Sequence, residues 1–258
     1  MLIVDLLAAA TEAAPQNKFG FAEALEQGGF IAYATVAILG VMSFGSFYIL
    51  FTKWFEQSKV MRQGGELGSF WKANSLRDGA SKLDKNSAWR QIVDDGVKAE
   101  EQASKMTDST EAHDWLHGSL ARSEATINAR LASGLPFLAT VGATAPFIGL
   151  FGTVVGIYRA LINIGIAGSA SIDKVAGPVG EALIMTALGL LVAVPAVLAY
   201  NYLQARNKRI AEQLTGFSTD VLANISSGGA VKPAVVVTGA AAAAPKTTVK
   251  PAAAPAKP

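Results

Sequence analysis

The chain has 258 residues, of which 51% are hydrophobic and 16% are charged, and its formal net charge is +2. Its most highly charged segment, residues 53–130, holds twelve basic and twelve acidic side chains, so the sequence lacks the electrostatic footprint of a nucleic-acid-binding protein. The absence of cysteine excludes disulfides, thiolate metal sites and a cysteine nucleophile.

Residues 1–29 precede the first long apolar stretch. Leu and Ile recur at helical spacing near the start of this segment, which predicts a short amphipathic helix lying on a membrane surface. A frayed terminus is the alternative. A cleaved secretory signal is disfavoured, because no Lys or Arg opens the segment and Asp5 interrupts its apolar run.

Three apolar stretches are each long enough to cross a membrane, since about 20 apolar residues span a hydrocarbon core about 30 Å thick. We predict transmembrane helices at residues 30–52, 135–158 and 175–202. The expected fold class is therefore an all-α membrane protein with three transmembrane helices and long cytoplasmic helical extensions.

The distribution of Lys and Arg predicts how these spans are oriented. Lys18 is the one basic residue ahead of the first span, whereas several basic residues follow it, precede the second span and follow the third. Basic residues favour the cytoplasmic side. We expect a periplasmic N-terminus, a cytoplasmic C-terminus and a short periplasmic loop at residues 159–174.

The cytoplasmic segment, residues 53–134, is predicted to be mostly helical, because apolar residues between Trp115 and Leu131 recur at spacings of three, four and seven. Asp108 or Thr110 is expected to cap this helix, which is predicted to continue into the second span. With its balanced charges, the segment is expected to pack as extensions of the spans and not as an independent domain.

The end of the chain changes composition. Residues 203–225 are predicted to extend the third span as a cytoplasmic helix. Residues 226–258 are rich in Ala and Pro and show no apolar periodicity, which is typical of a disordered tail.

The second and third spans are crowded with small residues, which let helix backbones approach closely in a membrane. The predicted packing positions are Gly149, Gly152, Gly156 and Gly189. Thr153 is a candidate polar residue of the second span, and a hydroxyl bonded to its own helix backbone is its more ordinary role.

Glu181 is the only charged residue within the three apolar stretches, and an ionisable group inside hydrocarbon usually marks an ion path, a proton relay or a polar helix contact. Two interpretations are open. If Pro178 occupies the first helical turn, Glu181 lies near the outer interface, where the helix dipole favours a carboxylate. If the helix begins earlier, near Ile172, the carboxyl group lies inside the membrane. Thr186 follows five positions later and is rotated by about 140°.

Motifs for catalysis are weak. His113 and His117 resemble the zinc-protease pattern HExxH, but Asp114 replaces the glutamate and there is no evident third ligand. The sequence also lacks a GxxxxGK[ST] phosphate loop and a GxSxG elbow. We therefore expect no enzymatic activity, no catalytic residue, no metal and no cofactor.

The run LPFLATVGATAPFIGLFGTVVGIYRAL followed by GPVGEALIMTALGLLVAVPAVLAYNY resembles the MotA, TolQ and ExbB proton-channel family. The likeness extends over about residues 130–209 and is strongest to the ExbB branch. Three spans, an outward N-terminus and a long first cytoplasmic segment also agree with ExbB and TolQ, whereas MotA-like relatives have four spans.

The resemblance implies an inner-membrane protein of a Gram-negative bacterium, in contact with membrane lipid, that forms a homo-pentamer around an ExbD-type partner in a central pore. Together they would use the proton gradient to drive a TonB-type energy transducer, which serves outer-membrane receptors for iron chelates and vitamin B12. The resemblance places the channel-facing glutamate and threonines of the family at Glu181, Thr186 and Thr153.

Two alternatives remain at this point. A TolQ-like subunit would serve outer-membrane integrity with a TolA-like partner. A purely structural scaffold would use Glu181 only to hold a partner helix, and nothing would be conducted.

Overall fold

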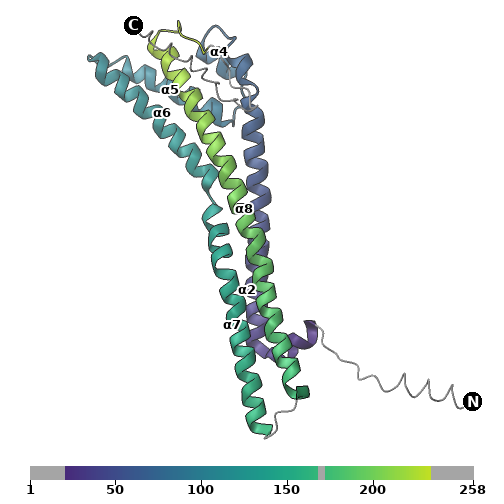
Figure 1. Ribbon diagram of the computed structural model, residues 1–258. Helices are drawn as coiled ribbons and strands as arrows, with labels where there is room; N and C mark the ends of the chain where they lie inside the picture. The colour runs from purple at the N-terminus through teal and green to yellow at the C-terminus, as the bar shows by residue number, and fades with distance from the viewer. Residues whose placement is uncertain (1–20, 168–171, 234–258) are drawn as a thin grey trace, which may run out of the picture. The chain divides into compact units, whose positions relative to one another are not determined.

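The computed structural model describes residues 21–167 and 172–233, except for the side chains of 21–28, 167, 172–178 and 181. Its elements are α-helices, shown in Figure 1: α2 (Phe21–Gly64), α3 (Leu67–Phe70), α4 (Leu76–Ser81), α5 (Ala88–Ala103), α6 (Ser109–Ala132), α7 (Leu135–Ala167) and α8 (Ile172–Ser226). The amphipathic helix predicted near the N-terminus, the centre of the predicted outer loop and most of the predicted disordered tail lie outside the described residues.

The chain divides into two compact units. The first unit comprises residues 1–55 and 132–206, and the second unit comprises residues 56–131 and 207–258. Helices α2 and α8 are continuous at residues 55–56 and 206–207, where the chain passes from one unit to the other. Each of these helices therefore contributes to both units.

In the first unit, α2, α7 and α8 lie side by side (Figure 1). One cluster of buried side chains joins the three helices, made of Leu39, Val141, Ala145, Ala193 and Ala196. A second cluster nearer the unit's end contains Leu135, Leu138, Ala199 and Leu203. Four of these nine side chains are alanine, so close backbone approach holds the helices together alongside the leucine and valine contacts.

Most of the large side chains of the first unit face outward. Phe44 is 76% exposed, and Phe147 and Leu191 are also largely exposed. Among the described residues, three helical stretches are long and apolar enough to cross a membrane, within α2, within α6 and α7, and within α8. This confirms an all-helical membrane protein with three long apolar helices, and it shows a multi-pass membrane protein.

The ends of α7 and α8 differ from the predicted span limits. Helix α7 continues beyond residue 158 to Ala167, and α8 begins at Ile172, the earlier of the two starts considered. Which part of each helix lies in the membrane stays a prediction.

The helix predicted to run from the cytoplasmic segment into the second span is broken, so this prediction was wrong. Helix α6 ends at Ala132, and α7 begins at Leu135. Between them Gly134 has φ 86°, a left-handed conformation that glycine adopts without a steric penalty. A Cβ at this position would also lie 3.1 Å from Ile49 Cγ2. At the other end of α6, Asp108 Oδ1 accepts from the Thr110 backbone N–H at 2.8 Å.

The second unit buries a larger core than the sequence suggested. Its aromatic centre consists of Phe70, Trp71, Trp89 and Phe217, and Phe217 makes edge-on contacts with the other three rings at centroid distances of 5.4, 5.9 and 5.5 Å. The Trp89 indole N–H donates to the Val60 carbonyl at 3.0 Å. The expectation of extensions without a core of their own was therefore incomplete.

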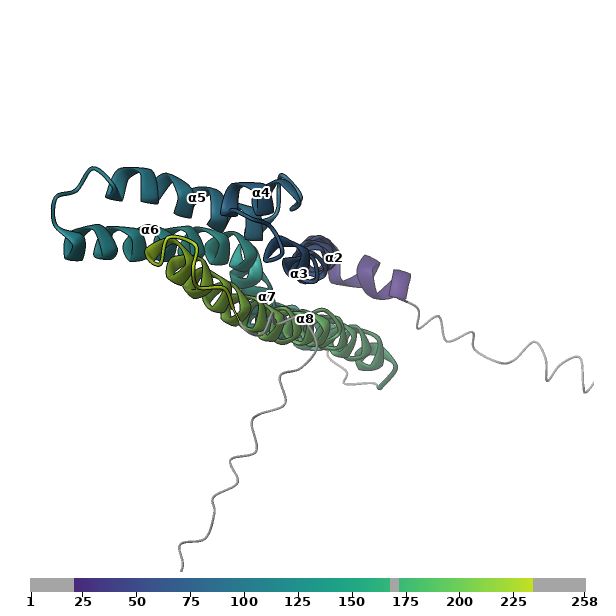
Figure 2. The same ribbon diagram turned by 90° about the horizontal axis from the view of Figure 1, so that it is seen from above.

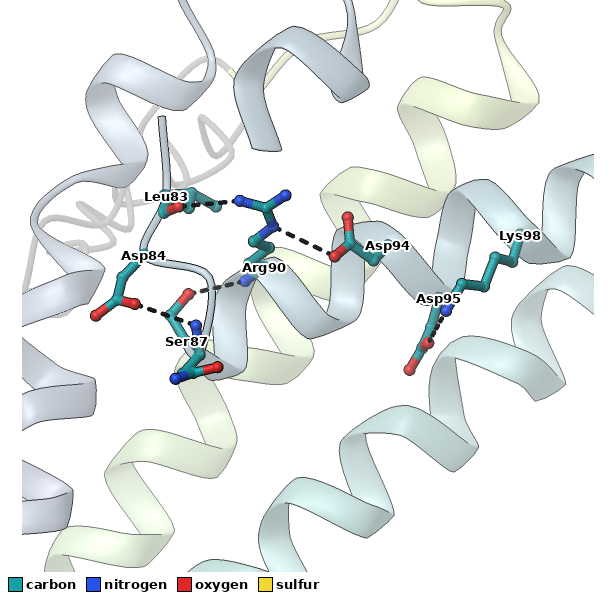
Figure 3. Close-up of polar contacts among 8 residues, drawn as sticks. Leu83, Asp84, Ser87, Arg90, Asp94, Asp95 and Lys98 are labelled. Carbon is teal, nitrogen blue, oxygen red and sulfur yellow. Dashed lines mark hydrogen bonds and ion pairs between the residues drawn. The ribbon is translucent and has the colours of Figure 1, made fainter. Parts of the chain in front are cut away.

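Helices α5 and α6 lie side by side in this unit (Figure 2). The start of α5 is fixed by polar contacts (Figure 3): Ser87 Oγ accepts from the Arg90 backbone N–H at 3.0 Å, and Arg90 Nε pairs with Asp94 at 3.3 Å. Such a serine at the N-cap satisfies a backbone donor that the helix itself leaves unpaired.

The described end of the chain folds back onto the second unit. Gly228 and Gly229 have positive φ and end α8, and Asn224 Nδ2 donates to the Val231 carbonyl at 2.7 Å. Lys232 Nζ then donates to the Ala73 carbonyl at 2.9 Å. These contacts border a cavity of about 270 Å³ between the α3–α4 connection, α5 and the end of α8.

Candidate functional site

The close contact between α7 and α8 is the structural centre of the candidate site. A Cβ at Gly149 would lie 2.6 Å from the Met185 carbonyl oxygen, and one at Gly189 would lie 2.7 Å from the Ala145 carbonyl oxygen. Real Cβ atoms do not approach backbone so closely, so only glycine permits this crossing. Two of the four predicted packing glycines are thus brought together directly.

A third predicted packing glycine, Gly152, faces two other helices. A Cβ there would lie 3.1 Å from Met185 Cβ and 3.3 Å from Thr35 Cγ2 of α2. Gly156 is buried on α7. The three helices of the first unit therefore meet around one short stretch of α7.

These contacts fix the register of the two antiparallel helices. Gly142 meets Val197, Gly149 meets Gly189, and Gly152 meets Met185. Continued at the rise of an ideal helix, this register puts Glu181 level with residues 156–158 and Thr186 level with residues 151–153.

Glu181 lies nine residues after the start of α8 at Ile172, about 14 Å along the helix at 1.5 Å per residue. Glu181 therefore does not lie near the first turn of α8, and the interpretation that places Pro178 in that turn does not apply. Its side chain lies outside the described residues, so the role of its carboxyl group stays a prediction.

The predicted threonines differ in their surroundings. Thr153 is only 7% exposed, and its hydroxyl donates to the Leu150 carbonyl at 2.7 Å. Thr186 is half-buried. Register places the two residues at the same level, but Thr153 lies on the buried side of α7 within one chain. A hydroxyl that donates to its own helix can still accept a hydrogen bond from water or from another donor.

A buried hydroxyl on α2 was missed in the sequence. Thr35 is 3% exposed, and its hydroxyl donates to the Ile31 carbonyl at 2.9 Å. It lies beside Gly152, at the level of Thr153. Its spacing of four residues from buried Leu39 was the signal that it belongs to the buried face of α2.

A charged residue was missed as well. Arg159 is the only charged residue of α7, and the helix continues past it with apolar residues. Its guanidinium Nη1 would lie 3.0 Å from a Cβ at Gly29, where α2 is kinked with φ 58° and ψ −154°. The uncharged run of the sequence ends at Tyr158, although the apolar pattern resumes directly after Arg159.

The two histidines do not gather further ligands in the described part of the chain. His113 and His117 are both exposed on α6, and the described residues contain no group of three or more His, Cys, Asp or Glu that would hold a metal. Metal binding therefore gains no support from the structure.

Two carboxyl groups outside the apolar stretches have shifted pKa values. The Asn86 backbone N–H, at 3.1 Å, and the Lys59 ammonium, at 3.3 Å, lower the pKa of Asp84. Gln63 Nε2 adds a further hydrogen bond at 3.0 Å. Burial raises the pKa of Asp220 on α8. Both groups belong to the second unit.

Comparison with known proteins identifies a family. Residues 84–215 match the MotA/TolQ/ExbB proton channel family. The chain is 36% identical over 213 residues to the biopolymer transport protein ExbB of Xanthomonas campestris pv. campestris, covering 78% of this chain and 84% of that protein.

Two further relatives share shorter segments. The chain is 50% identical over 120 residues to the biopolymer transport protein ExbB of Neisseria gonorrhoeae, covering 46% of this chain and 54% of that protein. It is 44% identical over 91 residues to the Tol-Pal system protein TolQ of Pseudomonas aeruginosa, covering 35% of this chain and 39% of that protein.

Proposed function

Because the chain belongs to the MotA/TolQ/ExbB proton channel family, we propose that it is an ExbB-like subunit that converts a proton gradient into mechanical work. With an ExbD-type partner it energises a TonB-type transducer for transport of iron chelates and vitamin B12 across the outer membrane. The observation that supports this proposal most is the 36% identity to an ExbB protein over 78% of the chain.

The proposed setting is the inner membrane of a Gram-negative bacterium, with the N-terminus periplasmic and the C-terminus cytoplasmic. Five copies surround a central pore that holds the partner. The outward-facing apolar side chains of the first unit support an assembly of this kind, because a single chain leaves large parts of Phe147, Leu183 and Leu191 uncovered. Such faces in a membrane protein contact lipid or other helices.

In the proposed mechanism, Glu181 takes up a proton on one side and releases it on the other, exchanging with an acid of the partner. Hydroxyls of Thr153 and Thr186, with water, extend the route. Their common level on α7 and α8 supports this part of the proposal. A proton that crosses 100 mV releases about 2.3 kcal/mol, which is available to move the partner helices against the bundle.

The decisive experiment measures proton flux into liposomes that contain the complex with its ExbD-type partner. Glu181→Gln keeps the shape of the side chain and removes its titration, so flux is expected to fall to the background of empty liposomes. The matched control is Glu212→Gln on the same helix, at an exposed position of the second unit. Undiminished proton flux in Glu181→Gln would contradict a proton relay through Glu181 and favour a purely structural scaffold.

A TolQ-like role is the second candidate, and the 44% identity to a TolQ protein over 91 residues favours it. That match covers a smaller share of the chain than the match to ExbB. Complementation separates the two roles. Restored growth on a ferric siderophore in a strain lacking its own ExbB supports the first role, whereas restored detergent resistance in a strain lacking TolQ supports the second.

A further inference from the structure

We propose that a pocket between α2 and α8 binds a single water molecule, which bridges the Ser43 hydroxyl to the Leu191 carbonyl beside Pro195. The water joins two helices of the first unit by hydrogen bonds among mostly apolar side chains. This inference does not rest on the proposed function, so its failure would leave the proton-flux experiment unaffected.

The pocket lies where one face of α2 meets one face of α8. Its lining includes Ser43, Ser46 and Leu50 of α2 and Val192, Pro195 and Ala199 of α8. Within each set the residues follow one another at spacings of three and four, which puts them on one side of their helix. All of them belong to the first unit, whose apolar outer surface indicates an apolar medium.

The donor on α2 is the Ser43 hydroxyl. Its neighbour in the pocket, Ser46, is 6% exposed and donates to the Met42 carbonyl at 2.8 Å. The hydroxyls of Thr35 and Thr52 also donate to their own helix. The half-buried Ser43 differs, because its hydroxyl makes no hydrogen bond within the described part of the chain. A hydroxyl without a partner is costly in an apolar medium, so Ser43 is a donor in need of an acceptor.

The acceptor is supplied by the backbone of α8. This helix is continuous from Ile172 to Ser226, so the Leu191 carbonyl would ordinarily accept from the backbone N–H four residues later. That residue is Pro195, which has no N–H and whose ring lies against the carbonyl four residues before it. Pro195 lines the pocket. A donor of α2 and an acceptor of α8 therefore border the same small space.

The size of the pocket selects its occupant. Its volume is about 10 Å³, and a space of about 10–15 Å³ holds one water molecule. A buried water needs about two to four polar partners. Here it accepts from Ser43, donates to the Leu191 carbonyl and donates to Ser46 Oγ, which retains acceptor capacity. A lipid chain in the same place would leave the Ser43 hydroxyl and the Leu191 carbonyl unpaired.

The first test is a double-mutant cycle on the purified full-length protein in detergent, with the thermal midpoint as the readout. Ser43→Ala removes the donor and is expected to lower the midpoint, because the Leu191 carbonyl loses its bridge. Pro195→Ala returns a backbone N–H to α8, so that this carbonyl is paired within its own helix. In that background the loss caused by Ser43→Ala is expected to shrink at least about threefold. Equal losses in both backgrounds overturn the proposal.

Two further variants exclude a simple packing effect. Ser43→Cys keeps nearly the shape of serine but replaces a strong donor by a weak one, so it is expected to lose as much as Ser43→Ala. Wild-type stability of Ser43→Cys overturns the proposal. Thr52→Ala is the matched control on α2, because the Thr52 hydroxyl donates to the Tyr48 carbonyl at 2.8 Å. Its effect is expected to be equal in both backgrounds, and a loss that shrinks as that of Ser43→Ala does overturns the proposal.

A density map that resolves water molecules gives the direct test and does not require Pro195→Ala to fold. In the wild-type protein a water is expected at about 2.7–3.2 Å from both Ser43 Oγ and the Leu191 carbonyl oxygen. It is expected to be missing in Ser43→Ala. The proposal is overturned by an empty pocket, by a water that persists in Ser43→Ala, or by a lipid chain, a detergent chain or a partner's side chain in its place.

Discussion

The two units of this chain bury their large side chains in opposite ways. In the second unit Trp89 is 1% exposed and packs edge-on against Phe217, which also contacts Phe70 and Trp71. In the first unit Phe44 of α2 and Phe147 of α7 are largely exposed, and alanines and glycines lie at the closest helix contacts. Water drives large apolar groups inward. A lipid medium does not, and close backbone approach replaces that driving force. The same chain therefore follows two packing rules, one for each medium.

The largest expected effect concerns the aromatic core of the second unit. Trp89→Ala removes a buried indole and its hydrogen bond to Val60, and it is expected to cost about 3–5 kcal/mol of unfolding free energy. Phe44→Ala, at a side chain that is 76% exposed, is expected to change stability by less than about 0.5 kcal/mol. Thermal unfolding in detergent, followed by circular dichroism, compares them. Similar losses in both variants would contradict two packing rules.

The next effect is specific to the first unit. Gly149→Ala adds a single methyl group, but that group would lie 2.6 Å from the Met185 carbonyl oxygen, and backbone cannot move aside cheaply. We expect a loss of about 1–3 kcal/mol, measured by the same unfolding experiment. Gly40→Ala on α2, where the new group meets open space beyond its own helix backbone, is the matched control and is expected to be neutral. A neutral Gly149→Ala would show that the helices separate readily.

A smaller effect concerns pH and the second unit. The pKa of Asp84 is lowered by the Asn86 backbone N–H and by Lys59. Since the folded pKa lies below the unfolded one, the carboxylate stabilises the fold above the unfolded pKa, and this contribution is lost as pH falls through the folded pKa. Asp84→Asn is expected to lower the thermal midpoint at pH 7, and the difference from wild type is expected to close toward pH 3. A difference that is constant with pH would refute this account.

The smallest effect has the opposite sign. Burial raises the pKa of Asp220, so the folded protein holds this proton more tightly than the unfolded chain does. Stability then decreases as pH rises from the unfolded pKa through the folded pKa. Asp220→Asn is expected to raise the thermal midpoint slightly at pH 7 and to leave it unchanged at pH 3. A lowered midpoint at pH 7 would indicate that the carboxylate makes a favourable contact.

The three apolar helices were predictable because length and composition alone define a membrane span. The length of α7 was not, because the charged residue Arg159 ends the uncharged run, although the apolar pattern continues beyond it to Ala167. The break before α7 was also missed. A single glycine is compatible with a helix, and only the left-handed φ of Gly134, beside Ile49, shows that it ends one.

The core of the second unit was beyond the reach of periodicity. Phe70 and Phe217 are far apart in the sequence, and the contact between their rings depends on how the chain returns through α8. In the candidate site, the glycines Gly149 and Gly189 were recognisable as packing positions from their type. Their pairing, and the register that puts Thr153 level with Thr186, required coordinates. The role of Glu181 stays a prediction, both from the sequence and from the structure.

The hydrogen bond from Lys232 Nζ to the Ala73 carbonyl has a practical consequence for experiments on living cells. A fluorescent reporter joined directly after Pro233 would begin from an anchored point on the second unit. Motion of that unit during energy conversion would then be transmitted to the reporter's emission dipole and become visible as a change in polarisation.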